Sequence, residues 1–81
     1  MTMSDTRFDG RKVYEFGRAS QAVYDIRGKY LHRANSASQP EYEIRGDNIH
    51  KAHSASMPEF DIRGNRIHKA HSASQAIYEI R

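Results

Sequence analysis

The stretch YEIRGDNIHK, residues 42–51, decides the fold. Apolar and charged residues alternate from Tyr42 to Arg45, which is the period-two pattern of a β-strand with one buried face. Gly46-Asp47 follows, and glycine in the first position of a two-residue turn supplies the positive φ that a tight hairpin needs. A second strand begins at Asn48. The stretch therefore predicts a β-hairpin.

The turn also sets the register of this hairpin. Pairing Arg45 with Asn48 places Ile44 opposite Ile49, Glu43 opposite His50 and Tyr42 opposite Lys51. The apolar side chains then share one face, with the Lys51 stem along Tyr42, and the polar side chains share the other. A slip of one residue would mix the two faces, so this register is the expected one.

The hairpin pattern recurs with a period of eighteen residues, marked by Gly10, Gly28, Gly46 and Gly64. A fixed period indicates one supersecondary unit that is copied and that cannot bury its apolar face alone. We expect repeat units at about 10–27, 28–45, 46–63 and 64–81. They form a single β-repeat domain over residues 6–81, preceded by a flexible N-terminus at residues 1–5. Residues 6–9 match the first strand of the unit and predict one extra strand.

Two arrangements would bury four such faces. In one, antiparallel hairpins surround an axis and turn their apolar side chains into a shared core. In the alternative, each repeat is one coil of a parallel β-solenoid. Stacked coils would align like charges at Asp25, Glu43, Asp61 and Glu79, which is unfavourable, and the Gly-Asp turn favours hairpins. We therefore predict an all-β fold of four 18-residue antiparallel hairpin repeats around one core.

The repeated pattern of Tyr, Ile, Gly, Asp or Asn, and Ile resembles that of small bacterial β-flower proteins, which are four-fold or five-fold. The resemblance covers residues 8–81. It implies short hairpins arranged as petals around a pseudo-symmetry axis, and it implies no activity. The Ser-Ala-Ser segments between hairpins and the arginine before each repeated glycine from Gly28 onward depart from that pattern.

Composition limits the class of protein. The chain has 81 residues, no cysteine and a formal net charge of +3, with an isoelectric point near 9.5. A domain this small has a modest core, and disulfides cannot supplement it, so oligomerisation or tight closure of the array is expected. There is neither a signal-peptide pattern nor an apolar run long enough to span a membrane. These features predict a cytoplasmic protein with no membrane association.

Basic residues recur in the repeat and predict one candidate site. A ring of guanidinium groups at one end of the array, joined by further cations that include Arg33 and Arg66, could hold phosphate or nucleic acid. Carboxylates are interspersed among these cations, however, and the competing interpretation is a solvated face of ion pairs. The candidate polyanion-binding residues are Arg27, Arg45, Arg63, Arg81, Lys51 and Lys69.

Histidines predict a second candidate site, for a metal ion. His50 and His53, and again His68 and His71, form His-x-x-His pairs. On a strand this spacing sends the two rings to opposite faces, so ligation would have to join histidines of different repeats. The competing interpretation is that duplication copied polar-face residues.

The aromatic series Tyr24, Tyr42, Phe60 and Tyr78 is in phase with the core isoleucines and is expected to pack rather than to bind a ligand. Nucleotide fingerprints, a nucleophile elbow and paired catalytic carboxylates are absent from the sequence. We therefore expect a protein that is not an enzyme and needs no cofactor. Its expected role is a structural or protein-interaction module that self-associates, since the last strand, residues 77–81, lacks a following partner. Its open edge would either pair with another chain or close against the N-terminal strand near Phe8. Nucleic-acid binding and metal binding are the alternatives.

Overall fold

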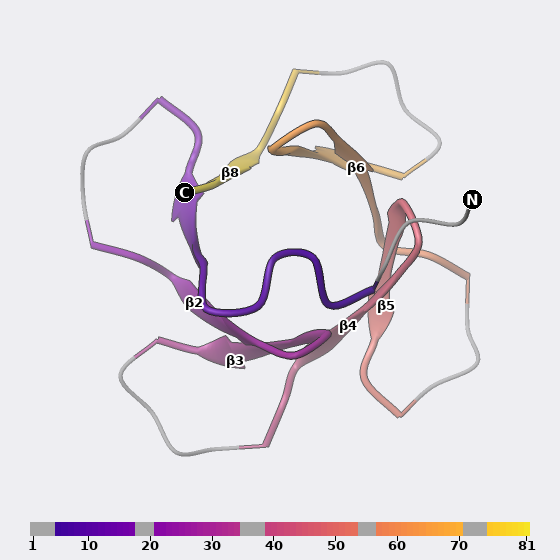
Figure 1. The fold of residues 1–81 in the computed structure, drawn as a ribbon. Coiled ribbons are helices and arrows are strands. Elements are labelled where there is room, and N and C mark those ends of the chain that lie inside the picture. Colours follow the sequence, from indigo (N-terminus) through magenta and orange to yellow (C-terminus); the bar gives the residue numbers. More distant parts are fainter. Residues whose placement is uncertain (1–4, 18–20, 35–38, 54–56, 71–74) are drawn as a thin grey trace.

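The fold is a closed β-barrel of short antiparallel strands (Figure 1). The structure, a computed structural model, describes residues 5–17, 21–34, 39–53, 57–70 and 75–81. All paired strands in these ranges are antiparallel, which confirms the predicted all-β hairpin fold and excludes the parallel solenoid. The strands are β1 (Lys12–Glu15), β2 (Tyr24–Arg27), β3 (Tyr30–Arg33), β4 (Tyr42–Arg45), β5 (Asn48–Lys51), β6 (Phe60–Arg63), β7 (Arg66–Lys69) and β8 (Tyr78–Ile80).

The predicted hairpin register is confirmed. In β4 and β5, Arg45 pairs with Asn48 and Ile44 with Ile49, and the same register recurs in β2–β3 and β6–β7. Gly46 between the strands has a φ of 62°, which an L side chain rarely adopts and glycine adopts freely. Each hairpin then joins the next through a shorter ladder, such as Ile49 opposite Phe60.

The two ends of the chain pair in the place of a fourth hairpin, with no turn joining them. Strand β8 pairs with β1, with Val13 opposite Ile80 and Tyr14 opposite Glu79. Lys12 and Arg81 exchange both backbone hydrogen bonds, at 3.0 and 2.8 Å. The last strand therefore has a partner. Of the two expected outcomes, closure against the N-terminal part of the chain is observed, although the partner is β1 and not the residues near Phe8. Closure is complete because every strand edge in the described barrel is paired.

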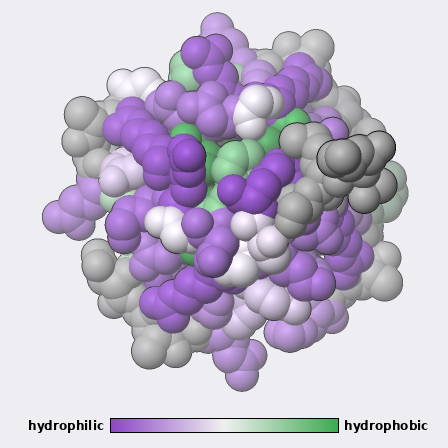
Figure 2. Space-filling model, in the orientation of Figure 1, coloured by the Kyte–Doolittle hydropathy of each residue, from purple (hydrophilic) through white to green (hydrophobic). Residues whose placement is uncertain are grey.

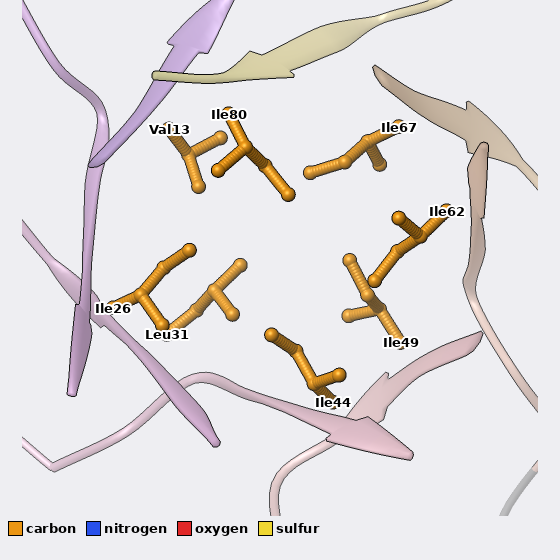
Figure 3. Close-up of a cluster of buried hydrophobic side chains, with 8 residues drawn as sticks. All are labelled: Val13, Ile26, Leu31, Ile44, Ile49, Ile62, Ile67 and Ile80. Atoms are coloured by element: carbon orange, nitrogen blue, oxygen red, sulfur yellow. The ribbon is translucent and has the colours of Figure 1, made fainter. Parts of the chain in front are cut away.

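Eight aliphatic side chains fill the interior, one from each described strand, and all point toward the barrel axis (Figure 3). Each is at most 5% exposed, and burying an aliphatic side chain of this size contributes about 1.5–3 kcal/mol. A single strand or hairpin could not surround them, so the core exists only in the closed barrel. They are Val13, Ile26, Leu31, Ile44, Ile49, Ile62, Ile67 and Ile80.

The aromatic series closes the end of the barrel away from the glycine turns. Adjacent rings meet edge to face, with centroids 5.6 to 6.2 Å apart, and the four contacts form a complete circle. This is the favoured geometry for aromatic pairs. Tyr24, Tyr42, Phe60 and Tyr78 are half-buried and pack against the aliphatic core.

Residues 5–10 form turns rather than the extra strand predicted for residues 6–9, so that prediction is wrong. The segment crosses the barrel at the end that carries the glycine turns (Figure 1). The carboxylate of Asp9 accepts a hydrogen bond from the Gly28 N–H at 2.7 Å, and Asp5 accepts one from the Gly46 N–H at 2.8 Å. Asp5 is thus anchored, although residues 1–5 were expected to be flexible; residues 1–4 lie outside the described ranges.

Phe8 of the same segment packs against the aliphatic core. The segment is a lid over the turn end, and its strand-like sequence is used for packing and capping instead of pairing. On this face a small hydrophobic patch near the axis is surrounded by hydrophilic side chains (Figure 2).

Candidate interaction surface

Ion pairs cover the outer face of the barrel. The carboxylates at the second position of β2, β4, β6 and β8 point outward, because their isoleucine neighbours point inward. Lys12 Nζ lies 2.9 Å from Asp25 Oδ1. Arg81 donates to Glu79 Oε1 from Nε at 3.2 Å and from Nη2 at 3.1 Å. Alternation therefore produces an outer face on which opposite charges meet.

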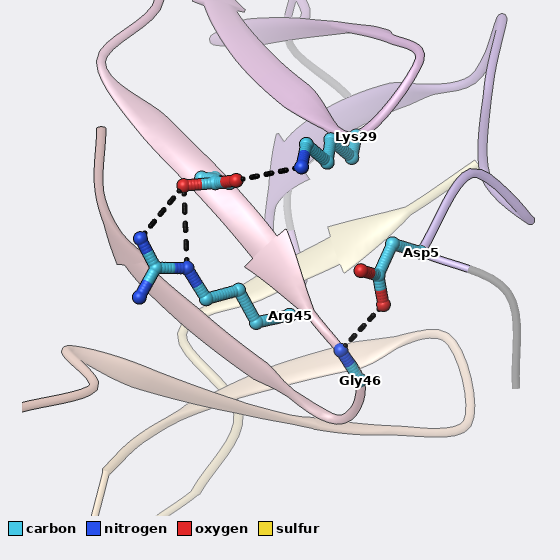
Figure 4. A network of polar contacts seen from close by, with 5 residues as sticks. Asp5, Lys29, Arg45 and Gly46 are labelled. Atoms are coloured by element: carbon cyan, nitrogen blue, oxygen red, sulfur yellow. Dashed lines mark hydrogen bonds and ion pairs between the residues drawn. The ribbon is translucent and has the colours of Figure 1, made fainter. Parts of the chain in front are cut away.

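Glu43 is the most enclosed of these carboxylates, being 8% exposed. Lys29 Nζ lies 3.0 Å from Oε2, and Arg45 donates to Oε1 from Nη2 at 2.9 Å and from Nε at 3.2 Å (Figure 4). The hydrogen bond from Lys29 lowers the pKa of Glu43 below its ordinary value; burial opposes this, and the contacts with Arg45 reinforce it. The carboxylate stays charged and ties two hairpins together.

The candidate polyanion-binding residues do not gather on one surface. Arg45 and Arg81 each bind the glutamate two residues earlier. Arg27 and Arg63 occupy the same repeat position and are exposed at the turn end. Lys51 and Lys69 lie at the other end of the barrel, opposite Tyr42 and Phe60. The structure thus places four arginines near one end and two lysines near the other.

The histidines are spread over the outer face. His50 lies opposite Glu43, and His68 lies opposite Asp61. His53 has a φ of 61°, and its ring stacks on that of Tyr30 with centroids 6.4 Å apart. His71 lies outside the described residues. Within those residues no group of three or more histidine, aspartate or glutamate side chains is placed to hold a metal ion.

One quarter of the outer face differs from the other three, and it lies over the junction of β1 and β8. Phe16 follows β1 and Ile77 precedes β8, and the Phe16 N–H donates to the Ile77 carbonyl at 2.9 Å. Both side chains are exposed, Phe16 by 39% and Ile77 by 37%. The surrounding side chains are aromatic or charged. We call the set Tyr14, Phe16, Arg66, Ile77, Glu79 and Arg81 the seam surface.

Two arginines of the seam surface lie over its aromatic rings. The Arg66 guanidinium carbon lies 5.1 Å from the centre of the Phe16 ring, and that of Arg81 lies 4.7 Å from the centre of the Tyr14 ring. Arg81 is also bound by Glu79. Among the described residues, Arg66 has no ion pair or hydrogen bond through its side chain, so its N–H donors face solvent.

The seam surface is not among the sites predicted from the sequence, although the sequence contains a signal for it. The repeat position of Tyr14 holds His32, His50 and His68 in the other copies. The position of Phe16 holds alanine in every other copy, at residues 34, 52 and 70. A departure from the repeat toward a larger, exposed apolar side chain adds nothing to the core, and it distinguishes this quarter of the barrel from the other three.

Comparison with known proteins identifies no relative. No protein-family model, no curated protein and no solved structure matches the chain. The resemblance to β-flower proteins therefore stays a prediction. No helix in the described part of the chain is long and apolar enough to cross a membrane.

Proposed function

We propose that the protein is a non-catalytic assembly module that self-associates through the seam surface. The observation that carries this proposal is the departure of one quarter of the barrel from its own repeat. Phe16 replaces a repeated alanine and stays 39% exposed beside Ile77. Aromatic side chains and arginine are enriched at the centres of protein interfaces, where they supply most of the binding energy.

Barrel closure restricts how association can occur. Because the described strands leave no free edge, another chain cannot extend the sheet by backbone pairing. Contact has to be made by side chains on the outer face. Phe16 and Ile77 of the seam surface are exposed apolar side chains on that face and can serve as its anchor. Arg66 is stacked on Phe16 and so loses little conformational freedom on binding.

A non-catalytic role is supported by the state of the outer carboxylates. Asp25, Glu43 and Glu79 each contact a cation at 2.9 to 3.1 Å. At Glu43 these contacts lower the pKa and hold the carboxylate in its charged form, which suits a stable surface rather than proton transfer.

Sedimentation equilibrium across micromolar to near-millimolar protein tests the proposal. We expect the wild-type chain to associate reversibly, and Phe16→Ala to weaken association by at least about tenfold, which is about 1.4 kcal/mol. Alanine occupies this position in the other repeats, so the variant should fold. Arg11→Glu changes an exposed residue at the other end of β1 and serves as the control. A wild-type protein that is monomeric at every concentration would exclude the proposed function.

Nucleic-acid binding and metal binding remain alternatives. A mobility shift that weakens with salt, and weakens further in Arg45→Ala and Arg63→Ala, would support polyanion binding. A rise in Tm on adding zinc that is lost in His68→Ala would support a metal site. The placement of the described residues favours neither over self-association.

A further inference from the structure

A second exposed apolar residue departs from the repeat. Met57 is 70% exposed, more than any other large apolar side chain in the described ranges. The other copies hold glutamine at this position, at residues 21, 39 and 75. As at Phe16, a polar or small repeat residue has been replaced by a larger apolar one that the core does not use.

Met57 is followed by Pro58 and by Glu59, which is exposed. We call these three residues the Met57 surface. Backbone hydrogen bonds anchor it to the barrel, since the Glu59 N–H donates to the Ile49 carbonyl at 2.8 Å and the Glu59 carbonyl accepts from the Ala70 N–H at 3.1 Å. No cation in the described part of the chain forms an ion pair with Glu59. Proline limits the backbone freedom that binding would otherwise remove.

The two surfaces are complementary in chemistry. The seam surface offers an exposed phenyl ring, an isoleucine and a guanidinium with open donors. The Met57 surface offers a thioether, which packs well against aromatic rings, and a carboxylate, which arginine can bind through two parallel hydrogen bonds. We propose that the Met57 surface of one copy docks on the seam surface of a second copy, with Met57 against Phe16 and Ile77 and with Glu59 on Arg66.

This inference rests on the proposed self-association and adds its occupant and its geometry. The surfaces lie at different places around the barrel, with β6 between them along the closed sheet. Each copy offers one surface of each kind. If the two surfaces of a copy bind different neighbours, the contact generates a ring where the rotation closes and an open chain where it does not; if the same two copies make both contacts, the result is a two-fold dimer.

Charge reversal separates the two surfaces experimentally. Arg66→Glu and Glu59→Arg should each weaken self-association by at least about tenfold, because like charges then face each other. An equimolar mixture of these two variants should regain assembly, since the unchanged Glu59 of one variant meets the unchanged Arg66 of the other and the two substituted side chains also carry opposite charges. The double variant Arg66→Glu, Glu59→Arg should regain the assembly of the wild type. Light scattering and sedimentation velocity report all four states.

Met57→Gln restores the repeat residue and tests the apolar half of the contact, and Arg11→Glu is the charge control. We expect Met57→Gln to weaken association and Arg11→Glu to leave it unchanged. Self-association that depends on Phe16 but survives Glu59→Arg and Met57→Gln would overturn this inference and leave the proposed function standing. Failure of the equimolar mixture to assemble, while the wild type does, would also overturn this inference. A monomeric wild-type protein would exclude both proposals.

Discussion

At the scale of the residue, one repeat position has different environments in different copies. Asp25 and Glu43 are equivalent in the sequence. Asp25 contacts Lys12 of β1, whereas Glu43 contacts Lys29 in the turn of the preceding hairpin and Arg45 of its own strand. Residue identity within a repeat therefore tunes local stability without changing the fold.

Glu43→Gln should change the pH dependence of stability. Because the pKa of Glu43 is lowered on folding, the unfolded chain binds more protons in acid. The stabilisation is complete above the ordinary carboxyl value of 4.5 and is lost as the pH falls through the lower folded value. In urea unfolding, the free energy of unfolding of Glu43→Gln should fall less steeply toward acid pH than that of the wild type. At neutral pH it should be lower than the wild-type value by about 1 kcal/mol.

Glu41→Gln is the matched control, since the Arg33 nitrogen lies 4.0 Å away at an open site. This change should alter the free energy of unfolding by less than about 0.5 kcal/mol. An acid limb that is the same in Glu43→Gln as in the wild type would contradict the assigned role of Glu43.

Tyr24 should make the free energy of unfolding depend on pH in alkaline solution, in the direction opposite to the effect of Glu43 in acid. Burial, reinforced by the neighbouring phenols Tyr42 and Tyr78, raises the pKa of Tyr24 from 10.0 to about 12. The folded chain therefore holds this proton longer than the unfolded chain, and stability should fall as the pH rises from about 10 to about 12. Tyr24→Phe should reduce that fall in urea unfolding, while Tyr30→Phe, outside the aromatic circle, should not. Equal alkaline loss in both variants would refute the assignment.

At the scale of the element, the hairpin and the N-terminal segment show how similar sequences take different structures. In each hairpin a glycine turn fixes the register of the two strands. Between β1 and β8, backbone pairing takes its place. Residues 6–9 resemble a first strand, but no second strand is free to pair with them, because β8 already occupies the place beside β1. Segments of the chain compete for the same place beside β1. Because β8 pairs there, residues 6–9 lie across the turn end instead.

The N-terminal segment should stabilise the barrel mainly through its two carboxylates and Phe8. Asp9→Ala should lower the free energy of unfolding by about 1 kcal/mol, because the Gly28 N–H loses a charged acceptor. Removing residues 1–9 should lower it by about 3 kcal/mol, since both acceptors and the packing of Phe8 are lost. Strand content in circular dichroism should be retained.

Asp47→Ala provides the comparison at an exposed ion pair, whose oxygen lies 3.3 Å from Arg7. This change should alter stability by less than about 0.5 kcal/mol. If Asp9→Ala and Asp47→Ala were equally mild in urea unfolding, the capping role of Asp9 would be wrong.

At the scale of the whole molecule, stability depends on joining the first and last strands. Without β8, the core would lose Ile80, the aromatic circle would lose Tyr78, and two strand edges would open. A domain this small has little stability in reserve. Closure replaces the oligomerisation that the length of the chain would otherwise demand, so self-association at the seam is a function to be tested and is not needed for folding.

Circular permutation tests closure directly. Arg81 and Lys12 exchange the same backbone hydrogen bonds as the residues flanking a glycine turn, so a Gly-Asp linker should join them. The permuted chain would lack residues 1–11 and open between residues 36 and 37. Its free energy of unfolding should lie within about 2 kcal/mol of that of a linear chain lacking residues 1–9, because moving the break changes loop entropy only slightly.

Deleting residues 75–81 is the contrasting variant, and it should abolish cooperative urea unfolding. An unfolded permutant beside a folded linear reference would show that the ends are not equivalent to the other hairpins. A cooperative unfolding transition in the deletion variant would show that closure is dispensable.

Part of the candidate site could be predicted from the sequence. The outward position of Glu43 and the inward position of Ile44 follow from alternation, and the ion pairs on the outer face were the weighed alternative to a polyanion site. Phe16, Ile77 and Arg66 could not be grouped beforehand, because they come from opposite ends of the chain and meet only across β8. Met57 was readable as a departure from the repeat, but its exposure was not.

Periodicity along the chain by itself determined the hairpin, its register, its inward face and the number of repeats, because each follows from short-range alternation and from the glycine at each turn. Only the tertiary structure decided that β1 and β8 pair, that residues 5–10 cover the turn end, and that the aromatic side chains close into a circle. These outcomes depend on which segments, distant in the sequence, pair and pack together in the closed barrel. A local period in the sequence contains no information about such long-range contacts.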